Sequence, residues 1–395
     1  MQNAKCKKKS AEKLCRGAGC RTAHFSPAPE VGWWKYKINC IGEEEMLSTL
    51  LIVIEVILVF SALILIHEFG HFIVAKAVGI KVHEFSLGMG PRITGIKRGE
   101  TEYNLRAIPI GGFIRPEGED AESEDPRAFG NKPLWARAAV VAAGPISNFI
   151  LAFIIIIALF TYLGRPAIIV GNLTAGMPAA SSGLQVGDVI TKINDKNVFF
   201  PPELIKQISS SKDAKISMTV IRNNKELRFN IPKVYSQTEK RFMVGVLPVQ
   251  EAAGFVQSNY WENLKLSPIY LAAIVDEIGR GLKGLFTGQV SKDEVGGPVK
   301  IIQITSEVAK TGIFNLLNLL ALLSLNLGIV NLFPIPALDG GRLIFFAIEG
   351  IRGKPIEQKK EAVAHMVGFV FLISLIILIT INDIKPWLQK LWVLF

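Results

Sequence analysis

The chain has 395 residues, of which 50% are apolar and 20% charged, and its formal net charge is +10. The apolar share is high for a soluble protein, so we expect membrane helices together with at least one soluble domain. A positive charge would suit a nucleic-acid-binding protein, but the basic residues are scattered among acidic residues and apolar stretches. We therefore expect no nucleic-acid partner and interpret the charge as juxtamembrane and surface charge.

The first 45 residues differ from the rest because they are rich in Lys and poor in aliphatic residues. All four cysteines lie here, at irregular spacing and without a CxxC pair, which argues against a disulfide framework or a zinc ribbon. Met46 opens an apolar stretch that reads like a protein N-terminus. We expect translation to start at Met46 and 1–45 to be an upstream extension. A targeting peptide is the alternative, although the segment has no short apolar core followed by a cleavage site.

Four stretches are long and apolar enough to cross a membrane, which takes about 20 mostly apolar residues. They lie at about 48–72, 136–163, 313–335 and 364–382. The loop before the last stretch is short and basic, which predicts a cytoplasmic position for it. The connection from 73 to 135 then lies on the cytoplasmic side, and the segment from about 165 to 250 lies outside.

Ionisable residues interrupt the end of the first stretch in the string HEFGH, which runs from His67 to His71. Ionisable groups at membrane depth are costly and usually functional. Two histidines at i and i+4 share one face of a helix about 5–6 Å apart, so both imidazoles can bind one metal ion. Glu68 would then stand beside the metal-bound water. His67 and His71 are therefore candidate zinc ligands.

A third ligand must come from another part of the chain, because catalytic zinc normally takes three protein ligands and one water. We predict Asp339, in the string NLFPIPALDGG. Pro334 and Pro336 would free backbone groups at membrane depth, which only a protein-lined or wet cavity tolerates. Gly340 and Gly341 let the backbone turn tightly beside the carboxylate.

Five ordered motifs resemble those of the site-2 protease family of intramembrane zinc metalloproteases, particularly its bacterial, anti-sigma-factor-cleaving branch with a PDZ domain. They are HEFGH at 67–71, FSLGMGPRI with YNLRAIPIGGFIRPEGED at 85–120, GPISN at 144–148, GGPVKI at 296–301 and NLFPIPALDGG at 331–341. The resemblance covers about 46–390. It implies the same three zinc ligands, and Glu68 as the general base.

The resemblance also implies substrate-binding residues. Asn331 and Pro334 match an NxxP pattern beside the active site, where Asn331 would bind the substrate backbone or stabilise the oxyanion. A helix-packing role for Asn331 is the alternative. The glycine-rich stretch 85–115 predicts a hairpin, and in the family a similar element enters the membrane and pairs with the substrate as an added strand. Gly111 and Gly112 are candidate substrate contacts on this element, with a plain surface hairpin as the alternative.

Other polar positions receive no chemical role. GPISN heads the second stretch, where small residues let helices approach closely, so we expect packing without chemistry. His83 and His365 have no partner at ligand spacing, and we interpret them as ordinary surface or interfacial residues.

Residues 164–250 resemble one PDZ domain, through GLQVGDVI and INDKNV. Such a domain either binds the new end of a trimmed substrate or shields the membrane entrance as a size filter. Residues 251–312 form an amphipathic, juxtamembrane region with Trp261 and Tyr270, which lies either along the outer membrane surface or partly buried.

The predicted fold class is a polytopic α-helical membrane protein with about four transmembrane helices, a membrane-associated β-hairpin region and one inserted PDZ (α+β) domain. The membrane parts are 46–163 and 313–395. We place the protein in the bacterial cytoplasmic membrane, with the PDZ domain on the extracytoplasmic side and the active site near the cytoplasmic side.

The predicted function is an intramembrane zinc metalloprotease that hydrolyses peptide bonds within or near transmembrane segments. Its partners would be the lipid bilayer and single-span membrane proteins, such as an anti-sigma factor or a remnant signal peptide. A membrane zinc carrier is the alternative from another class, but a carrier has little need for Glu68. An inactive scaffold is the third reading, and the full set of metal and base residues argues against it.

Overall fold

The computed structural model describes residues 32–119, 123–238, 240–248, 254–257, 259–288 and 296–392. Within the predicted extension 1–45, only the start of helix α2 (Gly32–Ala77) lies among them, so the interpretation of that segment stays a prediction. The chain divides into two compact units, Met1–Leu51 and Ile52–Phe395. Every contact described below lies within the second unit.

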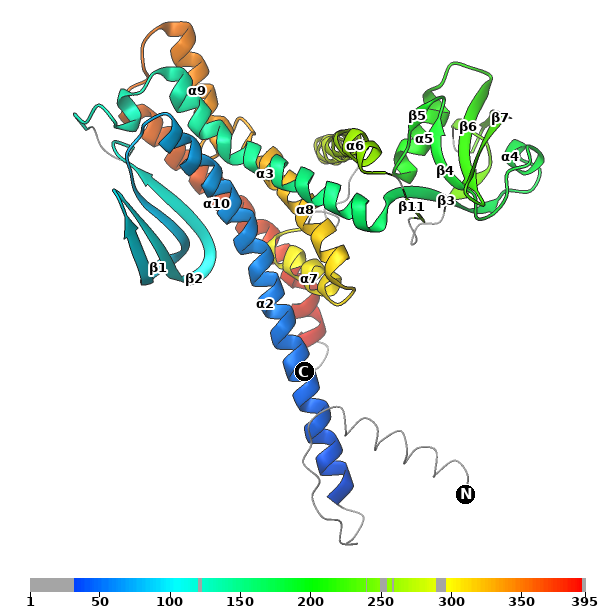
Figure 1. Cartoon of the computed structure of the whole chain (residues 1–395), viewed down its shortest axis with the longest axis horizontal. Helices are drawn as coiled ribbons and strands as arrows, with labels where there is room; N and C mark the ends of the chain where they lie inside the picture. Colours follow the sequence, from blue (N-terminus) through cyan, green and yellow to red (C-terminus); the bar gives the residue numbers. More distant parts are fainter. Residues whose placement is uncertain are drawn as a thin grey trace. The chain divides into compact units, whose positions relative to one another are not determined.

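Four helices of the described residues are long and apolar enough to cross a membrane, as predicted. They span Ser48–Ala77 of α2, Leu134–Leu163 (α3), Ile313–Asn331 (α8) and Lys359–Lys385 of α10 (Gln358–Trp392) (Figure 1). The third span ends four residues before the predicted limit of 335, because Pro334 has no N–H to continue the helix. The chain then turns and starts a further helix, α9 (Asp339–Arg352), which the sequence analysis did not predict.

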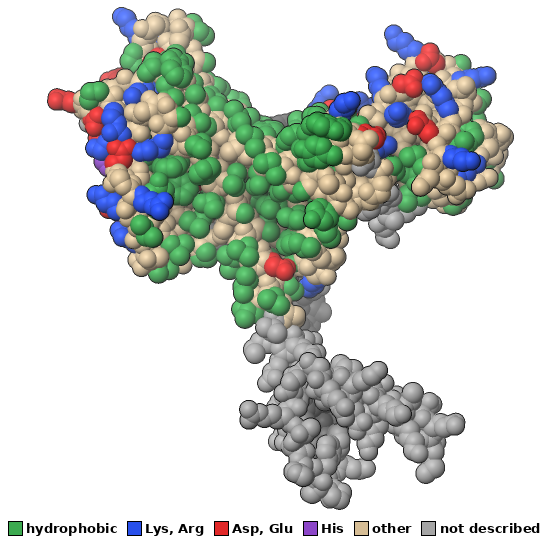
Figure 2. Space-filling model, viewed as in Figure 1, with side chains coloured by type: hydrophobic (Ala, Val, Ile, Leu, Met, Phe, Trp, Pro, Cys, Tyr) green, Lys and Arg blue, Asp and Glu red, His purple; other side chains and the backbone are tan. Residues whose placement is uncertain are grey.

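Helix α3 is in contact with α8, α9 and α6 (Tyr260–Phe286). Val59 of α2 packs with Leu316 of α8, and Ala75 of α2 shares a buried cluster with Val140 of α3 and Phe346 of α9. In Figure 2, hydrophobic side chains cover the helices, and charged side chains gather over the β-strands. This distribution fits helices that face lipid.

Helices α6 and α7 (Pro298–Ala309) occupy most of the region predicted to be amphipathic. Trp261 is 69% exposed, whereas Tyr270 is buried against Phe160 of α3 and Phe199. One face of α6 is therefore packed inside the protein, and its N-terminal aromatic residues remain on the surface.

The predicted hairpin is formed by β1 (Val82–Arg98) and β2 (Thr101–Pro116). Both strands bend, so that each pairs with its partner twice: Glu84 lies opposite Arg115 and also opposite Glu102. The result is a sheet of four segments in the spatial order 112–116, 84–87, 101–106 and 92–98. Within the described residues, segment 112–116 has no strand on its outer side.

A buried carboxylate fastens the middle of this sheet. Glu84 is only 4% exposed and accepts hydrogen bonds from Ser86, Asn104 and Arg106, the last two at 2.8 and 2.5 Å. Burial raises the pKa of Glu84, but these hydrogen bonds outweigh it and lower the pKa to about 2. The sheet is therefore held by an ionised group that bridges its segments.

Seven of the nine remaining strands of the described residues form a second sheet, which is followed in sequence by α6. Its main path runs in the order β10, β3, β4, β6 and β7, with β11 on β3 and β5 on β4, and β8 and β9 form a separate two-stranded ribbon. The core holds buried aliphatic residues such as Ile190, Ile216 and Leu204. The sheet continues to Val256, six residues past the predicted boundary at 250.

The bounds of these strands and of the short helices between them are β3 Arg165–Leu173, α4 Pro178–Ser181, β4 Val189–Ile193, β5 Lys196–Asn197, α5 Pro201–Ser210, β6 Lys215–Arg222, β7 Lys225–Pro232, β8 Val234–Ser236, β9 Arg241–Met243, β10 Val246–Pro248 and β11 Gly254–Val256. A short 3₁₀ helix before α3 spans Phe129–Asn131.

We predict that Glu84→Gln destabilises the β1–β2 sheet by about 1.5–3 kcal/mol, because it removes the charge from several hydrogen bonds. Amide hydrogen exchange of segment 101–106 at pH 7 should be correspondingly faster. The folded-state pKa of about 2 lies below the usual 4.5, so this stabilisation is present above pH 4.5 and is lost as the pH falls towards 2. Glu102→Gln, at the exposed pair with Arg92, is the control and should change little. Equal exchange in wild type and Glu84→Gln would contradict this account.

Candidate metal centre

Three ligand atoms from two distant parts of the chain converge at one point. Helix α2 presents His67 and His71 one turn apart, and α9 begins with Asp339. The Nε2 atoms of the two histidines are 3.2 Å apart, and Oδ2 of Asp339 lies 3.2 Å from His67 Nε2 and 3.6 Å from His71 Nε2. The structure thus brings together the three residues that the sequence predicted as ligands.

The spacing of these atoms fits zinc. Ligand bonds of about 2.0–2.1 Å at tetrahedral angles place neighbouring ligand atoms roughly 3.3 Å apart. The separations of 3.2 to 3.6 Å match the edges of such a tetrahedron. Oδ2 of Asp339 is also buried without a hydrogen bond, despite its short distance to His67. A buried carboxylate oxygen without a hydrogen bond is suited to a cation, and two imidazoles with one carboxylate are a donor set that zinc takes.

The backbone of α3 orients His71. Its Nδ1 lies 2.8 Å from the carbonyl oxygen of Val140, so Nδ1 carries the proton and donates to that carbonyl. Nε2 is then unprotonated and free to bind a metal. Gly144, one turn further along α3, makes room for this ring, since a Cβ there would lie 2.2 Å from His71 Nε2.

A buried amide orients His67 in the same way. Asn148 of α3 is fully buried, and its amide lies 3.2 Å from His67 Nδ1. With its amide oxygen toward Nδ1, Asn148 accepts a hydrogen bond from the N–H that a metal-binding His67 carries on Nδ1. The sequence analysis gave the GPISN motif a packing role only. Its last residue has a polar contact with a candidate ligand, and a buried Asn in an apolar span was the signal.

Asn331 approaches His67 from the side opposite Asn148. Asn331 ends α8, and its amide nitrogen is 3.4 Å from His67 Nε2, the atom that would hold the metal. Pro334 sits in the turn between α8 and α9, and within the described residues it has no hydrogen bond to a candidate ligand. Asn331 is thus the nearer of the two to the centre.

Glu68 lies between the ligands and the sheet. It is half-buried, and the charges of His67, His71 and Asp339 act on it. A Cβ on Gly112 would stand 3.3 Å from Glu68 Cγ and 3.0 Å from the carbonyl oxygen of Ser86. The outer segment of the β1–β2 sheet therefore passes directly beside Glu68. Gly111 has a positive φ of 96° and faces Met89 instead.

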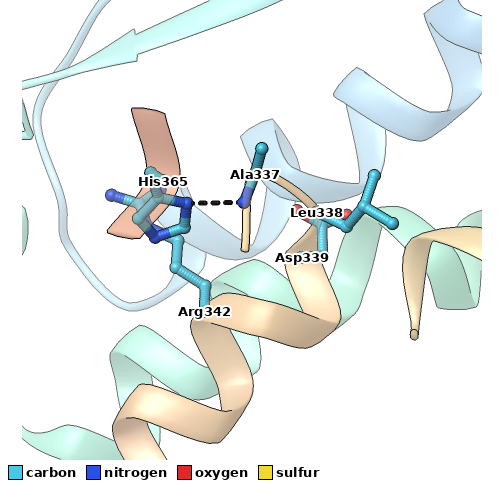
Figure 3. Close-up of a pocket in the computed structure, with 5 residues that line it drawn as sticks. All are labelled: Ala337, Leu338, Asp339, Arg342 and His365. Carbon is cyan, nitrogen blue, oxygen red and sulfur yellow. Dashed lines mark hydrogen bonds between the residues drawn. The ribbon is translucent and has the colours of Figure 1, made fainter. Parts of the chain in front are cut away.

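His365, like Asn148, is a residue near the centre whose role the sequence did not predict. His365 of α10 lines a cavity of about 210 Å³ together with Asp339, Arg342, Leu338 and Ala337 (Figure 3). It was interpreted as an ordinary surface or interfacial residue because no other ligand stands near it in sequence. His83, by contrast, forms a hydrogen bond at 2.5 Å with Glu117, which directly follows β2.

Known proteins resemble this chain over most of its length. The family model of peptidase family M50 matches residues 55–375. A protein of Clostridium acetobutylicum with the name of a zinc metalloprotease is 37% identical over 329 residues, covering 83% of this chain and 96% of that protein. The regulator of sigma-W protease RasP of Bacillus subtilis is 33% identical over 421 residues, covering 84% of this chain and 98% of that protein.

Among solved structures, the chain is similar to the PDZ domain of the SdrC-like protein of Listeria monocytogenes, with a TM-score of 0.21 and 22% identity. The match covers 22% of this chain and 92% of that domain. The extent of the match to the M50 family, and the identity to relatives that span nearly the same length, decide the family. The chain belongs to peptidase family M50, the site-2 proteases, and it is a zinc metalloprotease.

Proposed function

We propose that this metalloprotease hydrolyses peptide bonds within or near the transmembrane segments of single-span membrane proteins. The observation that carries the proposal is the position of His67, Glu68 and His71 on α2, inside a segment apolar enough to cross a membrane. Chemistry at that depth serves a substrate that also lies in the membrane. The relative named a regulator of sigma-W protease supports anti-sigma factors as one substrate class, and remnant signal peptides are a second.

His67, His71 and Asp339 hold the zinc in this proposal. When bound there, zinc polarises the scissile carbonyl and lowers the pKa of water. Glu68, between the ligands and the sheet, accepts a proton from the attacking water and later gives it to the leaving amine. No side chain of this set needs to form a covalent bond to the substrate.

The substrate binds as an added strand beside the outer segment of the β1–β2 sheet. Segment 112–116 has a free edge within the described residues, and Gly112 brings that edge next to Glu68. A membrane helix has to unwind before it is cut, and an open edge pairs the backbone groups that unwinding frees. Gly111 and Gly112 contact the unwound substrate, while Asn331 and Pro334 approach it from the α8–α9 turn.

The orientation follows from the charged loops. The short basic loop before α10 is cytoplasmic, so the active site lies near the cytoplasmic side and the seven-stranded sheet lies outside. That sheet forms a PDZ domain that shields the membrane entrance from proteins with bulky outer domains. Binding of a trimmed substrate end in its groove is the other possible role.

We predict that Glu68→Gln keeps zinc and lowers cleavage by at least 10²-fold, because the proton acceptor is lost. The measurement is zinc content and cleavage of a model membrane-span substrate by purified full-length protein. His71→Ala and Asp339→Ala should lose zinc and activity together. Cleavage by Glu68→Gln at the wild-type rate would show that another group takes the proton, and zinc uptake without cleavage by either form would favour the carrier reading.

A second prediction concerns Asn148. Asn148→Ala should raise the zinc dissociation constant by about 10–100-fold, because His67 loses the acceptor that orients its ring. Asn148→Asp keeps an acceptor and should stay close to wild type. The control is Ile150→Ala, on an exposed part of the same helix. If Asn148→Ala binds zinc as tightly as wild type in a chelator competition, the amide only packs.

A third prediction separates Asn331 from the ligands. Asn331→Ala should retain zinc and lower kcat by about 10²–10³-fold, as expected when a donor to a developing oxyanion is removed. Asn315→Ala changes an exposed amide on the same helix and serves as the control. Loss of folding in Asn331→Ala, with normal kcat in the folded fraction, would instead support the helix-packing role.

A further inference from the structure

The turn that delivers Asp339 depends on one side chain from outside it. We call residues 332–338 the ligand turn, since they join α8 to α9. Among its N–H groups, those of Leu332, Phe333, Ile335 and Leu338 bond to carbonyls within the turn or the end of α8. Pro334 and Pro336 have none. The N–H of Ala337 alone leaves the turn, and it donates to Nδ1 of His365 on α10 at 2.8 Å (Figure 3).

Ala337 is also the strained residue of the ligand turn. Its φ is +80°, a conformation that a residue with a Cβ adopts only at a cost of order 1–3 kcal/mol. Such a residue persists when its surroundings hold it. Ala337 precedes Asp339 by two positions, so a change in its φ or ψ would swing the carboxylate away from His67 and His71.

Helix α10 touches the ligand turn at a second point. Gly368 lies one helical turn after His365, and a Cβ there would stand 2.1 Å from the carbonyl oxygen of Pro336. Successive residues of the turn, Pro336 and Ala337, are therefore held by one face of α10. The contact of Gly368 with Pro336 and the hydrogen bond from Ala337 to His365 therefore hold the ligand turn from the same side.

The other nitrogen of His365, Nε2, is buried and makes no hydrogen bond within the described residues. Because Nδ1 accepts a hydrogen bond, Nε2 carries the proton of the neutral ring. Nε2 lies 3.7 Å from the carboxylate of Glu361, one turn earlier on α10. Glu361 in turn lies 3.9 Å from Nε of Arg342 on α9, and Arg342 is paired with Glu119. The contact between Arg342 and Glu361 thus joins α9 to α10 beside the cavity.

We propose that His365 is a positioning residue for the metal centre. Its Nδ1 holds Ala337 in the strained conformation, and this places Oδ2 of Asp339 within ligand distance of both histidines. The proposal rests on the assignment of Asp339 as a zinc ligand made above. His365 itself is not part of the group of ligand atoms that lie within reach of one metal ion.

A purely structural role would look different. His365 also contacts the ring of Phe345, with centroids 5.5 Å apart, and any smaller side chain would loosen that packing. Loss of packing lowers the stability of the fold regardless of whether the new side chain can accept a hydrogen bond. The acceptor at Nδ1 is what a positioning role requires.

The test compares two substitutions at one position in the purified full-length protein. His365→Leu fills similar space without an acceptor, whereas His365→Asn places an amide oxygen near the position of Nδ1. Zinc dissociation constants come from chelator competition, together with kcat and KM for a model membrane-span substrate. We expect His365→Leu to raise the zinc dissociation constant by about 10–100-fold with little change in KM. The zinc dissociation constant of His365→Asn should stay within about threefold of the wild-type value.

Three further variants complete the design. Gly368→Ala should weaken zinc binding as Leu does, because the added methyl pushes on Pro336. Gly281→Ala adds a methyl where nothing lies within 4 Å, and Met366→Ala changes the exposed neighbour of His365; both should bind zinc normally. Wild-type zinc affinity in His365→Leu overturns the proposal, and so does an equal loss in the Leu and Asn variants.

The variant Asp339→Ala separates the proposed role of His365 from the assignment of Asp339 as a zinc ligand. If Asp339→Ala loses zinc and His365→Leu keeps it, the ligand assignment stands and the role of His365 is wrong. If Asp339→Ala binds zinc as wild type does, the ligand assignment fails and the role of His365 fails with it. If Asp339→Ala and His365→Leu both lose zinc and His365→Asn retains it, the ligand assignment and the role of His365 are both supported.

Discussion

The convergence of three candidate ligand atoms within 3.2–3.6 Å of one another is the constraint on which the proposed metal centre depends. Two of these atoms lie one turn apart on a single helix, but the third comes from a residue 268 positions after His71 (339 − 71). In an apolar region each ligand must also have its remaining polar groups satisfied, because water is scarce there. Every ligand therefore needs support from another helix.

That support comes from different elements for each ligand. The carbonyl of Val140 and the amide of Asn148, both on α3, hold the two histidines. The ligand turn in front of Asp339 rests on α10. Helices in lipid associate through close packing rather than through a hydrophobic effect. Two helices can therefore approach closely where small residues lie at their contact. Gly144 and Gly368 stand at two such contacts, where any Cβ would collide with a ligand ring or with the ligand turn.

The sequence predicted those parts that follow from local spacing. HEFGH places two imidazoles on one helical face, and stretches of about 20 apolar residues mark the spans, so both were found without tertiary information. Helix α9 was not predicted because Pro334 and Pro336 precede it and Gly340 and Gly341 lie in its first turn, and these residue types are typical of turns. The contacts of Asn148 with His67 and of His365 with Ala337 join residues 81 and 28 positions apart. Periodicity does not say which residue of one helix faces which residue of another.

The supports also differ in what they leave free. The histidines and the ligand turn are held from the side of α3 and α10, whereas Glu68 faces the outer segment of the β1–β2 sheet through Gly112. The hydrogen bonds of Glu84 join the two inner segments of that sheet, next to the outer segment. A substrate strand added at the edge of that outer segment would run past Glu68 with its backbone groups paired. The histidines and the ligand turn would then stay in place during the reaction, because only the substrate helix has to unwind.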